Sequence, residues 1–203
     1  MRTIIYVALC CLTGCLARPH LDRQSFIFAL PSTATPKAAT GSRVLGIRTL
    51  QVAEPFEGRS FVYRTGEFSY DRDPYAEFMV HPAEGLVVPI SSWFRQAGGF
   101  SAVTEAGSAL KPNTLVEIQV GKLYGDFRPA EQPTAVLSMR FVFFDASNGA
   151  PGKVILQREY SRDIPLKART AVALIEGWNQ ALTQILDAAM LDFGRVAANA
   201  PTH

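Results

Sequence analysis

The chain has 203 residues, a formal net charge of +2 at pH 7, and 48% hydrophobic against 19% charged residues. These values are typical of a globular protein with a sizeable core and exclude an intrinsically disordered chain. The near-zero charge, with no basic stripe interleaved with aromatic residues, excludes a nucleic-acid-binding protein.

The first fifteen residues form a short apolar leader that ends in a cysteine. Arg2 supplies a positive charge, residues 4–12 are an apolar run, and the next two residues are small. The run is shorter than the roughly 20 residues that cross a bilayer and is typical of a signal peptide. Leu12-Thr13-Gly14-Cys15 matches the bacterial lipobox, whose cysteine thiol accepts a diacylglyceryl group before cleavage. We predict a signal peptide over residues 1–14 and lipidation of Cys15; the alternative is an ordinary signal peptide with a chance cysteine.

Lipidation of Cys15 would set the location of the protein. One acyl chain binds a membrane only marginally, whereas two or three chains such as palmitate give a lasting anchor, at about 0.8 kcal/mol per buried CH₂. Leu16 stands where an aspartate favours inner-membrane retention in many Gram-negative species. We therefore expect the periplasmic face of the outer membrane, with residues 15–25 as a lipidated tether.

All three cysteines, at positions 10, 11 and 15, lie at or before the lipobox. The mature domain therefore has no disulfide, no thiolate nucleophile and no cysteine metal site.

Short strands are predicted in the first half of the mature chain. Residues 25–30 and 44–52 are strand candidates, separated by a loop rich in Pro, Thr, Ala and Ser. A tight hairpin is expected around Thr65-Gly66, joining strands at 61–64 and 67–70. Asp71-Arg72-Asp73-Pro74 has turn composition. Another short strand is expected at 75–80.

Two amphipathic helices are predicted. The first follows His81-Pro82 and ends at Gly98-Gly99, and Pro89 within its apolar stripe argues for a late start or a kink. The second has helical spacing from about residue 168 to 193, and Gly194 is a plausible stop. Trp93 and Trp178 lie in these two stripes and are predicted to belong to the core.

Between the helices, a short extended segment (100–104) precedes three long strands at 114–124, 135–144 and 153–164, joined by connections short enough for an antiparallel meander. Gly121 is predicted to mark a bulge. The fold class is α+β: a mainly antiparallel sheet with two amphipathic helices packed on one side. One domain is expected over residues 26–196, followed by a disordered tail at 197–203.

Few residues suggest chemistry. His20, His81 and His203 each lack a second ligand at metal spacing, so no metal site is predicted, and no nucleophile motif or phosphate loop is present. Asp71 and Asp73 suit a turn better than acid–base work or Ca²⁺ binding. No catalytic residue and no cofactor are expected, and we predict that the protein is not an enzyme.

The connection at 125–133 is longer than a hairpin needs, and long loops are often functional. Within it, Phe127 beside Arg128 is a candidate contact for a partner or lipid. The alternative is a phenylalanine tucked back onto the sheet.

The chain resembles the ABC-type transport auxiliary lipoproteins, the family that includes paraquat-inducible protein C. Besides the lipobox, the resemblance is carried by short patterns in a characteristic order: 26–31, 44–47, 63–66, 75–78, 81–82, 93–94, 99–103, the three long strands and the last helix. It implies a non-enzymatic lipoprotein that docks a periplasmic MCE (mammalian cell entry) conduit protein at the outer membrane. The conduit works with an ABC permease and ATPase. The resemblance also implies self-association into a homo-oligomer.

Two further hypotheses remain beside this docking role. A lipid-binding module could shield an acyl chain itself, with Phe141 and Phe143 lining a cavity between sheet and helix. A cell-envelope enzyme is the third class, and the lack of a nucleophile–histidine pairing argues against it.

Overall fold

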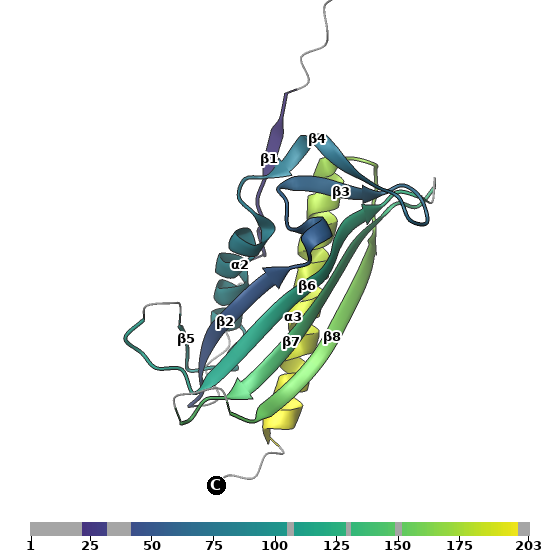
Figure 1. The fold of residues 1–203 in the computed structure, drawn as a ribbon. Coiled ribbons are helices and arrows are strands. Elements are labelled where there is room, and N and C mark those ends of the chain that lie inside the picture. The colour runs from purple at the N-terminus through teal and green to yellow at the C-terminus, as the bar shows by residue number, and fades with distance from the viewer. Residues whose placement is uncertain (1–21, 32–41, 105–107, 129–130, 149–151, 199–203) are drawn as a thin grey trace, which may run out of the picture.

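The fold is a single sheet covered by two helices. The computed structural model describes residues 22–31, 42–104, 108–128, 131–148 and 152–198. Within them lie an eight-stranded sheet, two α-helices and one 3₁₀ turn, so the predicted α+β class is confirmed (Figure 1).

The longest strands form the predicted antiparallel meander. They are β6 (Thr114–Asp126), β7 (Thr134–Asp145) and β8 (Val154–Pro165), with β7 paired to both neighbours. Alternate residues of β7, from Leu137 to Phe143, are completely buried because they face the helices. The β6–β7 register shifts between Val120 and Lys122, which confirms the bulge expected at Gly121.

The opposite edge of β6 is shared by two parallel strands. The first half of β6 pairs with β2 (Val44–Val52), and its end pairs with β3 (Ser60–Arg64). The 3₁₀ turn η2 (Glu54–Phe56) lies between those two strands in the chain. The sheet continues outward on each branch, with β5 (Ala102–Thr104) parallel to β2, β4 (Tyr70–Phe78) antiparallel to β3, and β1 (Gln24–Phe26) parallel to β4. The sheet is thus mixed, and its longest ladders are antiparallel.

The region of the predicted tight hairpin differs from expectation. The connection between β3 and β4 is longer than two residues, because the amides of Thr65 and Gly66 both donate to the carbonyl of Ser69. The segment predicted as a turn, Asp71–Pro74, lies inside β4. The β3–β4 register shifts beside this segment, which forms a bulge. Asp73 Oδ1 makes the hydrogen bonds typical of a turn there, since it accepts from the amides of Tyr75 and Ala76 at 2.8 and 3.0 Å.

The first helix, α2 (Pro82–Gln96), starts directly after His81 and contains Pro89. The predicted start at His81-Pro82 is confirmed, since Pro82 occupies the first helical turn, where a missing N–H costs nothing. Of the two alternatives raised by Pro89, the late start is therefore wrong. The helix ends as predicted, with Gly98 at φ 75°.

The second helix, α3 (Ala171–Ala198), starts later and ends later than predicted. Thr170 Oγ1 accepts the amide of Ala173 at 3.2 Å, which fixes the start at residue 171. The helix passes through Gly194, so the predicted stop there is wrong. Residues 199–203 of the predicted tail lie outside the described residues.

The core lies between the sheet and the two helices. Both helices cover the same face, because the ring of Phe143 on β7 contacts Phe94 of α2 and Phe193 of α3. Trp178 is completely buried and Trp93 nearly so, which confirms both as core residues. Trp178 packs edge-on against Phe61 and donates from Nε1 to the carbonyl of Val136 at 3.2 Å.

Candidate functional site

The predicted lipidation site, Cys15, lies outside the described residues. The structure begins close to it, because β1 starts at Gln24, inside the predicted tether. Nine residue steps separate Cys15 from Gln24, which an extended chain spans in about 32 Å at most. If Cys15 is anchored, the edge of the sheet formed by β1 and β4 is therefore held close to the membrane.

The predicted contact residue Phe127 directly follows β6 and is half-buried. Its ring packs against Tyr63 with a centroid distance of 4.6 Å, and the guanidinium carbon of Arg169 lies over the same ring, 5.3 Å from its centroid. Arg169 also donates from Nη2 to the carbonyl of Phe127 at 2.9 Å. This packing resembles the tucked alternative more than an exposed contact, and a partner role for Phe127 stays a prediction.

The neighbouring Arg128 is exposed, and Asp126 balances its charge. Its Nε donates to Asp126 Oδ1 at 2.9 Å and its Nη2 to Oδ2 at 2.5 Å, a two-point ion pair between residues of the same strand end. The hydrogen bonds from Arg128 hold the pKa of Asp126 below its usual value. Because the charge of Arg128 is already balanced by Asp126, this pair adds little net charge to the surface. What it presents to a binding partner is its shape and its hydrogen-bond donors.

A hydrogen bond between β3 and β4 holds Asp73, the residue at the β4 bulge. Tyr63 donates from its hydroxyl to Asp73 Oδ2 at 2.7 Å. The pKa of the Tyr63 hydroxyl is raised far above its usual value, mainly by burial and to a smaller extent by that hydrogen bond to the Asp73 carboxylate. Asp73 is therefore occupied by structural contacts, and among the described residues no group of three acidic, histidine or cysteine side chains is placed to hold a metal ion.

Aromatic residues gather beside this polar contact. Tyr70 and Tyr124 meet edge to face at 5.4 Å, and Phe56 from η2 contacts both rings. Phe68, in the β3–β4 loop, is 88% exposed. The sequence interpretation missed Phe68 because it placed residues 67–70 in a strand, where alternation gives an aromatic side chain a buried position.

The rings proposed as cavity lining, Phe141 and Phe143, are instead packed against each other and against Phe193 and Tyr160. Both are completely buried. Side chains thus fill the space between sheet and α3 at the place where the acyl-chain hypothesis needs a cavity.

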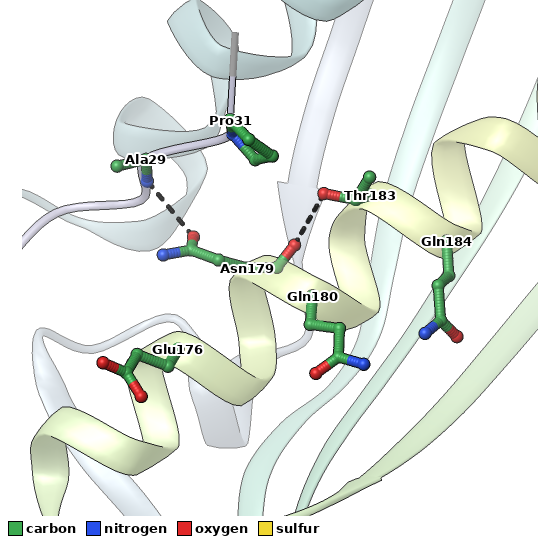
Figure 2. A pocket seen from close by; sticks show the side chains of 7 residues that line it. All are labelled: Ala29, Pro31, Glu176, Asn179, Gln180, Thr183 and Gln184. Atoms are coloured by element: carbon green, nitrogen blue, oxygen red, sulfur yellow. Dashed lines mark hydrogen bonds between the residues drawn. The ribbon is translucent and has the colours of Figure 1, made fainter. Parts of the chain in front are cut away.

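A surface groove of about 430 Å³ runs along α3 beside the segment that follows β1 (Figure 2). The amide of Ala29 donates to Asn179 Oδ1 at 3.1 Å, so Asn179 holds this segment against the helix. The side chains of Gln180 and Gln184 point away from the segment that holds Ala29 and Pro31 (Figure 2). Apart from Glu176 its lining residues are uncharged, and the surface they expose is mostly apolar. These residues do not include the convergent titratable groups of a catalytic site.

None of the described helices combines the length and apolar character that a membrane span requires.

Comparisons with known proteins give a fold and no family. No family model and no curated protein matches the chain. A crystal structure of a Xanthomonas campestris protein from the family model DUF330 superposes with a TM-score of 0.72 at 16% identity, covering 87% of this chain and 100% of that one. An uncharacterised protein superposes with a TM-score of 0.66 at 12% identity over 84% and 98% of the two chains. A hypothetical protein from Chlamydia trachomatis gives a TM-score of 0.50 at 13% identity over 78% and 100%. The chain shares the overall fold of these proteins.

Proposed function

We propose that this protein is a non-enzymatic, lipid-anchored component of the bacterial envelope that docks the MCE conduit of an ABC-type lipid transporter at the outer membrane. The observation that carries the proposal is the leader ending in Leu12-Thr13-Gly14-Cys15, with the first strand of the domain, β1, starting nine residues after the cysteine. The order of short sequence patterns along the chain and the fold shared with the DUF330 representative support it.

The proposed partners follow from the same resemblance. They are an MCE-domain protein, the permease and ATPase that energise transport, and further copies of this chain. The packed core supports docking over the alternative of a lipid-binding module, because Phe141 and Phe143 leave no room for an acyl chain between them and α3.

The anchor is tested by fractionating intact cells that produce wild type, Cys15→Ala or Cys11→Ala. We expect Cys15→Ala to leave the membrane fraction and to fold normally, since the core lies far downstream. Cys11→Ala is the matched control, because Cys11 lies in the leader, before the predicted cleavage point. This variant should stay with the outer membrane. Outer-membrane retention of Cys15→Ala would refute the anchor.

The docking role is tested by co-purification of the anchored wild-type protein with the MCE-domain protein of the same organism. We expect the two to co-purify from crosslinked cells. Failure of this pair to associate, with Cys15 shown to be lipidated, would leave an envelope lipoprotein and remove the transport role.

A further inference from the structure

A second groove lies on the other branch of the sheet, between β2 and α2. It has a volume of about 440 Å³, and we call it the β2 groove. Ile47 and Leu50 line it from β2, Glu84, Val87 and Ser91 line it from α2, and Thr104 lines it at the end of β5. It belongs neither to the loop of Phe127 nor to the groove on α3.

The β2 groove runs along an open edge of the sheet. β5 pairs with β2 only from Val44 to Gly46, and beyond Gly46 no strand of the described part pairs with this side of β2. The amide of Ala53 donates to the carbonyl of Val120 on β6, so by alternation the N–H and C=O groups of Leu50 and Val52 point outward. An edge of this kind is a template on which an extended polypeptide can add one more strand.

A buried hydroxyl in the groove has no partner. Ser91 is completely buried, and its Oγ makes no hydrogen bond among the described residues. A serine within a helix commonly bonds to the carbonyl four residues earlier, and Ser91 does not. An unpaired buried hydroxyl lowers stability. A ligand that enters the groove and bonds to Ser91 would remove that cost.

The charges of the groove select the ligand further. Arg48 also lines the groove, and its Nη1 pairs with Glu117 Oε1 on β6 at 2.6 Å, which balances its charge. Glu84 is exposed, lines the groove and has no ion-pair partner in the described part of the chain. Ile47, Leu50 and Val87 supply apolar surface. The groove thus fits an extended segment with alternating apolar side chains and one basic side chain.

We propose that the β2 groove binds an extended polypeptide segment of the docked partner, which continues the sheet beyond β5, bonds to Ser91 and places a basic side chain at Glu84. The inference rests on the proposed function, because the partner is the MCE-domain protein. It adds the surface that this partner occupies and the conformation it adopts there.

The first test measures the affinity of the mature, nanodisc-anchored protein for the periplasmic domain of that MCE-domain protein. Ser91→Ala is expected to bind about five- to tenfold more weakly, the effect of one lost hydrogen bond, with a melting temperature equal to or above wild type. Ser138→Ala is the matched control. Ser138 Oγ is also buried without a partner, but it lies against Gly121 and does not line the β2 groove.

A charge reversal and hydrogen exchange complete the test. Glu84→Lys should weaken binding more than the equivalent change at Glu176, which lies in the groove on α3. In the complex, the amides of Leu50 and Val52 should exchange more slowly than in the protein alone.

The outcomes separate the two proposals. If the wild-type protein does not bind the MCE domain, the proposed function fails and the docking segment fails with it. If wild type binds while Ser91→Ala and Glu84→Lys bind equally well and Leu50 gains no protection, the β2 groove alone is overturned. Weaker binding by Ser138→Ala or Glu176→Lys to the same extent would also overturn it, because the effect would then not be local.

Discussion

A methyl group added to Gly177 would lie 2.7 Å from the Cβ atom of Ala135, closer than two such atoms approach in proteins. It would also lie 2.8 Å from a methyl carbon of Leu166. Gly177 is in α3 and Ala135 is in β7, so the small pair sets how closely the helix lies on the sheet. This glycine is required by space and not by backbone conformation.

Gly177→Ala is therefore expected to destabilise the protein even though alanine is the better helix former. We expect a loss of about 1–3 kcal/mol in the free energy of unfolding, because the added methyl group meets the backbone-anchored Cβ of Ala135 and over-packs the core. Urea unfolding followed by circular dichroism measures the change.

Gly194→Ala in the same helix is the control, and its expected effect has the opposite sign. A methyl group there meets nothing within 4 Å. The helix should gain stability, by up to about 1 kcal/mol, as a glycine is replaced within a helix. A stabilising Gly177→Ala would show that α3 can move away from β7, contrary to the tight contact.

The second prediction concerns Phe127, the candidate contact after β6, and Phe68, the exposed phenylalanine of the β3–β4 loop. Phe127→Ala should lower the free energy of unfolding by about 1–2 kcal/mol, because its half-buried ring packs on Tyr63 and lies beside the guanidinium of Arg169. Phe68→Ala should leave stability within about 0.5 kcal/mol of wild type, because its ring is 88% exposed. Both are measured by denaturant unfolding. If the stability of Phe127→Ala equals that of wild type, the ring does not stabilise the fold, and the alternative of an exposed contact for a partner is favoured.

The long strands of the sheet could be predicted because their burial pattern is local. Val116, Ile118 and Val120 alternate with polar residues, and the structure buries all three against the helices. Gly121 interrupts that alternation, and the register shifts there. The final helix was equally visible from its stripe, and only its ends were misplaced, since Thr170 caps it and Gly194 does not stop it.

The remaining features depend on contacts between distant residues. Asp73 has turn composition, yet it lies in β4, which pairs with β3, and its carboxylate accepts a hydrogen bond from the hydroxyl of Tyr63 on β3. The parallel pairing of β2 with β6 leaves no mark in either sequence. The β2 groove was missed for the same reason, since an open edge and an unpaired Ser91 hydroxyl are defined by what lies beside them in space.

The third prediction concerns the buried indole of Trp178. Trp178→Phe should cost about 2–4 kcal/mol, because it removes the hydrogen bond to the carbonyl of Val136 and leaves a cavity beside Phe61 and Phe78. Trp93→Phe is the control, with a smaller expected loss, because Trp93 is slightly exposed and lies near the α2 surface. Equal losses for the two variants would contradict the role of the Trp178 hydrogen bond. Thermal and urea unfolding measure both.

The last prediction is a pH dependence at Asp126. Hydrogen bonds from Arg128 hold the pKa of Asp126 in the folded protein below its usual value. A carboxylate with a lowered folded pKa contributes stability that is fully present above the unfolded pKa, about 3.9, and is lost as the pH falls through the folded pKa.

Asp126→Asn should therefore be less stable than wild type by a constant amount between pH 6 and 8, and the difference should shrink as the pH falls below about 4. Unfolding in urea at several pH values between 2.5 and 7 measures it. Arg128→Ala should raise the pKa of Asp126, which carboxyl NMR titration detects, whereas Arg140→Ala should not, because Arg140 bonds to Gln119. A stability difference between wild type and Asp126→Asn that stays constant down to pH 2.5 would show that the ion pair with Arg128 does not stabilise the fold.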